Sequence, residues 1–596
     1  MTKPRAPGPF PFLQMQSSKN SGLGKFSLTK MVCVVFVFCA AAAISAPAQT
    51  FTTLVEFDYG NGAGPNAPLI QGIDGSLYGS TLGDGASINS TLFKMTPEGS
   101  LTTLYTFCAE NSCADGKNRQ TALVQSTDGN LYGTTSNGGT GGNAGTVFRI
   151  TPEGKLTTLY SFCTEANCPD GGLPTALLQA TDGNFYGTAW GQTGTSLGTV
   201  FKITSTGNLT TLATFCTSPG FNCPYGDAPN GLIQATDGNF YGTTAEGGAF
   251  GYGTVFKITP AGTLTALYSF CAQKPCADGA NPMAGLVQAS DGNLYGTTLY
   301  GGTGKGSARK CSSTIGCGTV FKITLQGEHT TLYNFCSQPN CSDGLYPFTA
   351  NLIQATDGKF YGADDGGGTS GSGTVFVTNA LGKLRKLHDF CVPFSNTCSD
   401  GLDPHAGVFQ ATNGVFYGTA PAGGSYDIGT LFSLSTGLSP FVTFLRNSGK
   451  VGQTAQILGQ GFTGATGVSF NGTPASFTLE SDAYLTASVP PGATTGSIAV
   501  AEPAGTLTSN KIFRVIPQIS SFSPTIGPVG TIVVITGDSF TGAAEVVFAC
   551  GKKATFTVDS DTRITATLPA RAMSGAINLV TPGGNVGSTT DFTVTP

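Results

Sequence analysis

Asp364 and Asp365 are the residues of this sequence whose pairing most directly suggests chemistry. Two neighbouring carboxylates can hold calcium or act as a general acid and a general base. A carboxylate-based polysaccharide hydrolase or lyase needs no further sequence motif. Because adjacent residues of an extended chain point apart, a solvated loop is the structural alternative for this pair.

Three aromatic residues stand in Gly-rich segments where they could contact a ligand. Trp190, the only tryptophan, could stack on a sugar ring or on a partner side chain, as could Tyr300 and Tyr426. The structural alternative for Trp190 is that it fills a gap between repeated units.

Residues 300–318 form the longest of these Gly-rich segments, and they carry Arg309 and Lys310. This segment is the first choice for a specific ligand contact, because variable loops on a rigid scaffold are common binding sites. The structural alternative is a solvated insertion that is stiffened by a disulfide between Cys311 and Cys317.

Other catalytic patterns are absent from the sequence. Only three histidines occur, and no G-x-S-x-G, Walker or dinucleotide motif stands in a suitable strand-to-helix setting. Residues 49–437 contain sixteen basic and twenty-six acidic residues, a net charge of −10, which makes nucleic acid a poor partner. We therefore expect a binding protein without catalytic residues, cofactor or metal.

Calcium is the alternative to this expectation, because one aspartate recurs before a glycine after most of the cysteine pairs. Each unit offers only one such acid, whereas a calcium loop needs alternating oxygen ligands. An Asp-Gly turn is the structural explanation. These residues are Asp115, Asp170, Asp278, Asp343 and Asp400.

Fourteen cysteines form seven close pairs. In an exported chain this spacing favours local disulfides, whereas the C-x-x-C or Cys/His spacing of zinc sites is absent. Six pairs would staple the crossover between consecutive units. The predicted disulfides are Cys108 with Cys113, Cys163 with Cys168, Cys216 with Cys223, Cys271 with Cys276, Cys311 with Cys317, Cys336 with Cys341, and Cys391 with Cys398. Cys550 is left over, as a buried apolar residue or an exposed thiol.

The N-terminal segment has the pattern of a signal peptide. Basic residues precede an apolar run at residues 31–44, which ends in the small-residue sequence A-P-A. We predict a signal peptide over residues 1–48 with cleavage near Ala48, no membrane span in the mature chain, and a secreted or cell-surface location.

A repeated unit positions all of these residues. It occurs seven times and reads, in its third copy, A-L-L-Q-A-T-D-G-N-F-Y-G-T from residue 176, a Gly-rich loop, G-T-V-F-K-I-T from residue 198 and L-T-T-L-A-T-F from residue 209. Asp-Gly and Thr-Pro-x-Gly sequences are turn signals, so each unit predicts a four-stranded meander. Apolar residues on both faces require a neighbouring sheet on each side.

Seven such sheets predict a seven-bladed β-propeller over residues 49–437. A strand at residues 51–57 resembles the fourth strand of a unit and could complete the last blade, although residues 438–445 are a rival for that place. Seven glutamines at one point of the inner strand are expected to bridge adjacent blades. Gly-rich loops and crossovers share one face of the ring, where we expect the ligand.

A new doublet begins after the propeller. G-Q-T-A-Q-I-L-G-Q-G-F-T-G-A from residue 452 matches G-T-I-V-V-I-T-G-D-S-F-T-G-A from residue 530, with short, evenly spaced strands between turns. These residues resemble the IPT/TIG family of immunoglobulin-like domains. The resemblance implies two β-sandwiches, over residues 438–515 and 516–596, and hence an all-β protein throughout.

The repeats, with D-G-N-F-Y-G-T and G-T-V-F-K-I-T in order, resemble the GloVer tandem repeat of exported bacterial proteins. The resemblance implies a surface or secreted location and no settled activity. We therefore predict a monomeric, non-catalytic scaffold that binds an extracellular glycan or protein through the loop face. The alternatives are a carboxylate-based polysaccharide hydrolase or lyase on the propeller, and a purely structural surface protein.

Overall fold

The computed structural model describes residues 49–83, 89–109, 112–120, 122–191, 198–216, 223–304, 311, 315–348, 351–393 and 398–596. The predicted signal peptide, residues 1–48, lies outside these ranges. The described residues form strands and three single-turn helices, η1 (Pro339–Cys341), η2 (Phe462–Gly464) and η3 (Ala549–Gly551). No helix within the described ranges is long and apolar enough to cross a bilayer.

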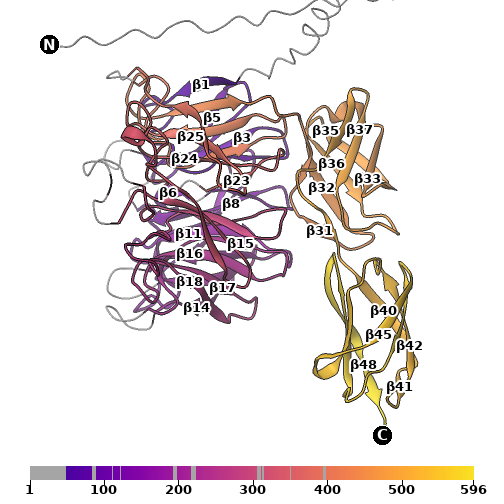
Figure 1. Cartoon of the computed structure of the whole chain (residues 1–596). Coiled ribbons are helices and arrows are strands. Elements are labelled where there is room, and N and C mark those ends of the chain that lie inside the picture. The colour runs from indigo at the N-terminus through magenta and orange to yellow at the C-terminus, as the bar shows by residue number, and fades with distance from the viewer. Residues whose placement is uncertain are drawn as a thin grey trace, which may run out of the picture. The chain divides into compact units, whose positions relative to one another are not determined.

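Seven antiparallel sheets follow the seven repeats, and we number them as blades 1 to 7 (Figure 1). Blades 1 to 3 contain β2 (Ile70–Gln71), β3 (Leu77–Ser80), β4 (Thr91–Met95) and β5 (Leu101–Thr106); β6 (Lys117–Gln120), β7 (Val124–Gln125), β8 (Leu131–Asn137), β9 (Thr146–Ile150) and β10 (Leu156–Ser161); and β11 (Pro174–Gln179), β12 (Phe185–Ala189), β13 (Thr199–Ile203) and β14 (Leu209–Thr214).

Blades 4 to 6 contain β15 (Asp227–Gln234), β16 (Phe240–Glu246), β17 (Thr254–Ile258) and β18 (Leu264–Ser269); β19 (Val287–Gln288), β20 (Leu294–Thr298), β21 (Thr319–Ile323) and β22 (His329–Asn334); and β23 (Ile353–Gln354), β24 (Phe360–Asp364), β25 (Thr374–Thr378) and β26 (Arg385–Asp389). Blade 7 contains β27 (Val408–Gln410), β28 (Phe416–Ala420) and β29 (Thr430–Ser435), with β1 (Thr50–Glu56) as its fourth strand. The predicted four-stranded meander is confirmed in blades 1 and 3 to 6, whereas blade 2 has two short strands, β6 and β7, that both pair with β8.

The two predicted turns build the meanders of blades 1 to 6. In blade 4, Asp237 Oδ1 accepts the backbone N–H of Asn239 at 3.1 Å, and Gly238 takes a φ of 82°, which favours glycine. After the third strand, the Gly262 N–H donates to the carbonyl of Thr259 at 2.9 Å. Both turns reverse the chain within a few residues, so consecutive strands pair as neighbours.

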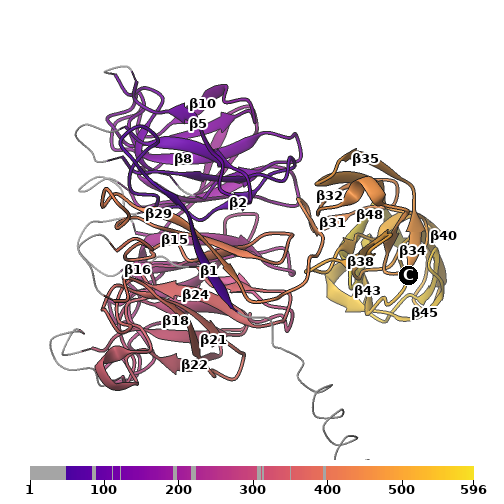
Figure 2. The same cartoon turned by 90° about the horizontal axis from the view of Figure 1, so that it is seen from above.

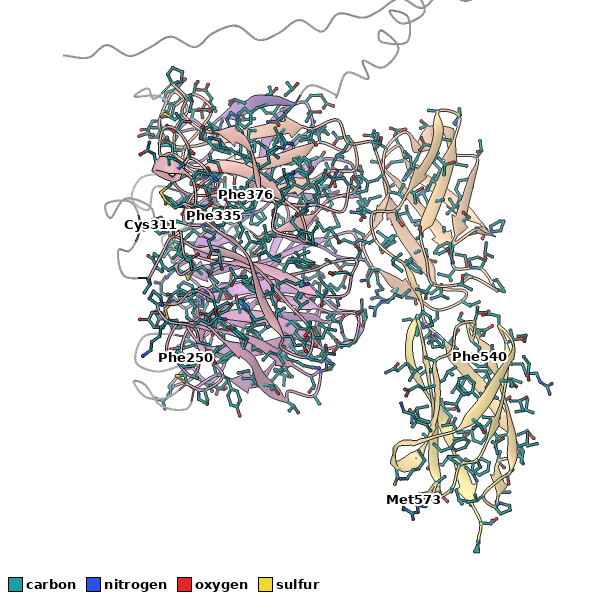
Figure 3. All side chains as sticks on the ribbon, in the orientation of Figure 1. Phe250, Cys311, Phe335, Phe376, Phe540 and Met573 are labelled. Atoms are coloured by element: carbon teal, nitrogen blue, oxygen red, sulfur yellow. A yellow bond between two sulfur atoms is a disulfide. The ribbon has the colours of Figure 1, made fainter. Side chains whose placement is uncertain are left out.

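The core of the propeller lies between the blades. Tyrosines of the second strand stack on a phenylalanine of the next blade, as Tyr186 does on Phe240 with ring centroids 4.2 Å apart. Phe335 of blade 5 packs edge-to-face on Phe376 of blade 6 at 5.3 Å (Figure 3). The prediction that both sheet faces are buried is therefore confirmed.

The ring closes through side chains as well as strands. In each blade one glutamine accepts a backbone N–H from an adjacent blade, as Gln234 Oε1 does from Thr181 at 2.9 Å. The Thr412 N–H of blade 7 donates to Gln71 of blade 1 at 2.9 Å, which completes the circle. These glutamines are Gln71, Gln125, Gln179, Gln234, Gln288, Gln354 and Gln410.

The N-terminal strand is the clasp of the ring. β1 pairs antiparallel with β29, with Thr50 opposite Ser435 and Glu56 opposite Thr430, and the two strands lie side by side in Figure 2. The rival segment takes no part in this sheet, since β30 (Thr443–Phe444) pairs with β32 (Thr454–Leu458) of the following domain. The chain therefore closes its ring with its N-terminal strand.

Two β-sandwiches follow, each with its own core. The first joins a sheet of β30, β32, β36 (Tyr484–Ser488) and β35 (Phe477–Ser481) to one of β34 (Thr473–Ala475), β33 (Gly467–Phe470), β37 (Ile498–Glu502) and β38 (Gly505–Thr508), with β31 (Ser448–Gly449) paired to β39 (Arg514–Val515). The second joins β40 (Gln518–Ser523), β42 (Ile532–Asp538), β46 (Arg563–Thr567) and β45 (Thr555–Ser560) to β41 (Ile526–Gly527), β48 (Gly584–Val594), β47 (Gly575–Thr581), β43 (Glu545–Phe548) and β44 (Lys552–Lys553). Phe540 lies in this second core (Figure 3).

Candidate functional site

A cavity of about 400 Å³ lies in the propeller, between the segments that lead into the inner strands. Its lining residues come from blades 1 to 6. Most of them stand one to five residues before the recurring glutamine of their blade, so the inner strands carry them to a common space. A volume of this size falls within the range of about 300–1,000 Å³ that is typical of small-ligand sites.

Trp190 and Asn230 form one wall of the cavity. The indole Nε1–H of Trp190 donates to Asn230 Oδ1 at 3.0 Å, and Asn230 Nδ2 donates to the carbonyl of Ala228 at 3.1 Å. Asn230 is 6% exposed, whereas Trp190 is only partly buried. The bond joins blade 3 to blade 4, so the amide holds the indole in place while the ring lines the cavity.

Two further asparagines line the cavity, and one of them, Asn351, has an amide group that can bond a ligand. Asn66 Oδ1 is buried and has no hydrogen-bond partner within the described part of the chain. Asn351 Oδ1 accepts the Gly285 N–H at 2.6 Å, and no described residue accepts from its Nδ2 group. A ligand that accepts the N–H of Asn351 is therefore favoured, because an amide group without a partner costs about 1–3 kcal/mol when the ligand covers it.

No titratable side chain is found among the cavity-lining residues that the structure describes. Leu177, Leu232, Leu286 and Met283 supply apolar surface beside the amides. The described wall therefore offers apolar contact and neutral hydrogen bonds, without a group able to act as a general acid, a general base or a carboxylate ligand for a metal.

The structure separates the remaining aromatic candidates from this cavity. The Tyr300 ring packs edge-to-face on Tyr346 at 5.5 Å, and its backbone pairs with Ala280. Tyr426 is 54% exposed and packs against Tyr59 at 6.1 Å. Of the three predicted aromatic contacts, only Trp190 lines the cavity. The basic candidates Arg309 and Lys310 lie outside the described residues.

The two adjacent carboxylates also lie apart from the cavity. Asp364 is the last residue of β24 and is fully buried, with its Oδ2 accepting the hydroxyl of Thr374 at 2.7 Å. Burial raises the pKa of Asp364 well above its ordinary value, and the neighbouring charge of Asp365 adds to the effect. Asp365 Oδ2 pairs with His405 Nε2 at 3.2 Å. The solvated-loop interpretation of this pair is therefore wrong for Asp364.

The recurring aspartates after the cysteine pairs have structural partners. Asp115 accepts the hydroxyl of Tyr105 at 2.9 Å and the N–H of Cys108 at 3.0 Å. In blade 6, His388 takes the place of the tyrosine and bonds Asp400 at 3.0 Å. These carboxylates fix the crossover loop against the fourth strand, which agrees with the structural explanation of the Asp-Gly sequence.

The structure contains all seven predicted disulfides, from Cys108–Cys113 to Cys391–Cys398. The sulfurs of Cys311, Cys317, Cys336 and Cys341 lie within 4.8 Å of one another. Because they are bonded in pairs, a metal could use them only after both disulfides were reduced. Cys550 is exposed, so of its two predicted states the exposed thiol is the one observed.

His329 begins β22 and lies in an aromatic environment rather than in a site. Its ring stacks on Tyr268 with centroids 4.3 Å apart, and burial lowers its pKa to about 4. The unfolded chain, with an ordinary histidine pKa, binds more protons than the folded chain between about pH 6.5 and 4. Stability therefore falls as the pH drops through this window.

We expect His329→Leu to remove this part of the pH dependence, since leucine holds the same place in blades 1 to 4. Urea unfolding at pH 7.5 and pH 5 measures the effect. The wild-type protein should lose about 2 kcal/mol more than the variant over this interval, because one pKa unit corresponds to about 1.4 kcal/mol. Equal losses in the two proteins would contradict the assignment.

The cavity amides were not predicted from the sequence, although a signal for them exists. The repeated unit is nearly constant at its glutamine and at its D-G turn, but it varies just before the glutamine. Asn66, Asn230 and Asn351 all fall in this variable stretch. In a repeat protein, positions that vary while the rest of the repeat stays constant are the positions at which the blades differ in surface chemistry.

The fold and the cavity define an all-β protein in which a seven-bladed propeller precedes two immunoglobulin-like sandwiches. The chain belongs to the Gloeobacter/Verrucomicrobia repeat family, whose repeat matches residues 41–173, 164–310 and 306–477. The IPT/TIG domain matches residues 517–595. Both family resemblances noted from the sequence are thus confirmed.

The solved structures to which the chain is similar are distant. A catalytically inactive virginiamycin B lyase from Staphylococcus aureus is 14% identical over 65% of this chain and 99% of that chain, with a TM-score of 0.43. The extracellular domain of a hybrid two-component system from B. thetaiotaomicron is 12% identical, with coverages of 91% and 67% and a TM-score of 0.41. A surface glycan-binding protein from Prevotella bryantii is 21% identical, with coverages of 26% and 39% and a TM-score of 0.20. No curated protein matches the chain. None of these likenesses assigns a ligand.

Proposed function

We propose that this protein is an extracellular, non-catalytic binding protein whose ligand occupies the central cavity of the propeller. The observation that carries the proposal is the cavity itself, in which a partly exposed tryptophan and several amides converge from different blades. Apolar surface with a few convergent polar groups is the usual composition of a ligand site. Seven disulfides favour an oxidising, extracellular setting.

The absence of titratable side chains from the described lining favours binding over catalysis. A carboxylate-based hydrolase needs two acids that flank the scissile bond. Asp364 is buried against Thr374, and Asp365 is paired with His405, so neither lines the cavity. Polysaccharide turnover that is abolished by Asp365→Ala would support the enzyme instead and would contradict this proposal.

Trp190→Ala is expected to weaken ligand binding by about tenfold or more, which corresponds to about 1.4 kcal/mol. The substitution removes the aromatic wall and leaves Asn230 Oδ1 without its donor. The mature chain is first screened on an array of glycans, and the hits are then measured by calorimetry with the wild type and the variant.

Tyr426→Ala is the matched control, because Tyr426 is an exposed aromatic residue of blade 7 that does not line the cavity. Its affinity should equal that of the wild type. If Trp190→Ala binds as tightly as the wild type, the ligand does not use this cavity. If neither variant nor wild type binds any extracellular ligand, the purely structural alternative is favoured.

A further inference from the structure

We propose that the cavity selects an uncharged saccharide, of one or two pyranose rings, and discriminates against acidic sugars. This inference rests on the proposed function, because it names the ligand class of the same cavity. It is carried by three properties of the described wall: its lack of charge, the unpaired amide N–H group of Asn351 and its volume.

A charged ligand would lose its hydration in this cavity without compensation. The described lining contains no Asp, Glu, Lys, Arg or His residue, so it offers a carboxylate or sulfate no counter-charge. Burial of an unpaired charge costs several kcal/mol. The net charge of −10 over residues 49–437 adds a long-range repulsion against anions. The described wall and the net charge therefore both disfavour anionic ligands.

A purely apolar ligand fits the wall equally poorly. Asn351 Nδ2 lacks an acceptor among the described residues. A lipid tail would leave this amide group unpaired, whereas a sugar hydroxyl can accept its N–H. The same cavity therefore requires a neutral ligand that is rich in hydroxyl groups.

Apolar surface beside the amides completes the match. The Trp190 indole is held by its bond to Asn230, and Leu177 and Leu232 line the cavity on neighbouring strands. A pyranose ring has C–H groups on its faces and hydroxyls at its rim, so it can contact both kinds of surface at once. A preorganised aromatic wall also lowers the entropy cost of binding.

The volume limits the length of the ligand inside the cavity. A space of about 400 Å³ lies at the small end of the range for ligand sites. At about 30 Å³ per water molecule it holds roughly a dozen waters, which is room for one or two pyranose rings. A longer glycan would therefore enter with one end.

The test compares neutral saccharides with their uronic acids. Calorimetry with the mature chain uses glucose, galactose and mannose disaccharides, each beside the counterpart that carries a C6 carboxylate. We expect at least one neutral sugar to bind about tenfold more tightly than its uronic acid, a difference of about 1.4 kcal/mol. Trp190→Ala should remove this binding.

Met283→Lys is expected to remove the preference for neutral sugars, because Met283 lines the cavity and lysine adds a cation on a side chain of similar length. The ratio of uronate to neutral affinity should rise by about tenfold or more. Met283→Leu is the matched control, which keeps a neutral side chain of similar volume and should keep the wild-type ratio.

The outcomes separate the two proposals. If uronic acids bind the wild type as tightly as neutral sugars, and Trp190→Ala removes both, the cavity binds ligands but the selection of uncharged sugars is wrong. If no saccharide binding depends on Trp190, the saccharide proposal fails, and the proposed function also fails unless another ligand binds in a Trp190-dependent way. An unchanged ratio in a folded Met283→Lys protein would also overturn the charge argument.

Discussion

Deletion of residues 49–57 is expected to unfold the propeller as a whole rather than to loosen blade 7 alone. These residues contain β1, which pairs with β29 and closes the ring. Phe57 is fully buried between blades 7 and 1, where the centroid of its ring lies 5.7 Å from that of Phe93. Loss of the clasp exposes a strand edge and a core face at the same place, so the closed circle no longer shields its apolar sheets.

Phe57→Ala tests the same point with a single substitution. A buried phenylalanine truncated to alanine costs about 3–5 kcal/mol. The emission of Trp190 provides the readout, because this tryptophan lies in blade 3, far along the sequence from the clasp. We expect Phe57→Ala to shift the urea midpoint of the Trp190 transition, and the deletion to abolish the folded signal.

Phe540→Ala is the matched control, since Phe540 is an equally buried phenylalanine in the core of the second sandwich. It should destabilise that sandwich and leave the Trp190 transition unchanged. If Phe57→Ala also left the Trp190 transition unchanged, the blades would unfold independently and the clasp would not stabilise the ring.

Asp364→Thr is expected to stabilise the propeller by about 1–3 kcal/mol at pH 8. In four other blades a threonine holds this place and its hydroxyl bonds a threonine of the third strand at 2.8–3.0 Å. The substitution restores that pair with Thr374 and removes a fully buried carboxyl group.

The pH dependence distinguishes this explanation from a general packing effect. Burial raises the pKa of Asp364 in the folded chain above its unfolded value, so the carboxyl favours folding less as the pH rises through the folded pKa. The gain from Asp364→Thr should therefore be larger at pH 8 than at pH 4. Asp365→Thr is the control, because it removes an ion pair with His405 and should not stabilise the protein. A gain that is the same at both pH values would contradict the assignment.

The repeats alone were sufficient to predict most of the fold. The Asp-Gly and Thr-Pro-x-Gly turns are local signals whose backbone requirements are known, so they defined the meander. A sheet that is apolar on both faces needs a neighbouring sheet on each side, and this requirement predicted the ring. The choice of closing strand could not be made, because residues 51–57 and 438–445 have similar patterns and their pairing depends on contacts distant in sequence.

The site was less accessible to sequence reasoning. Trp190 was predicted from its rarity, but the amides are common residues that gain meaning only where the inner strands converge. The role of the recurring aspartates could have been inferred. Tyr105 and Asp115 occur in the same repeat, whereas the third repeat has Ala213 in place of the tyrosine and Tyr225 in place of the aspartate. Residues that change together across repeats are expected to be in contact.

Fluorescence of Trp190 provides the most direct test of ligand binding in the central cavity, because this residue is the only tryptophan of the chain and lines that cavity. The mature protein is titrated with the neutral saccharide that binds most tightly in calorimetry. We expect a saturable change in Trp190 emission whose midpoint equals the calorimetric Kd. Calorimetric binding of the sugar with unchanged Trp190 emission would place the ligand elsewhere and contradict the account.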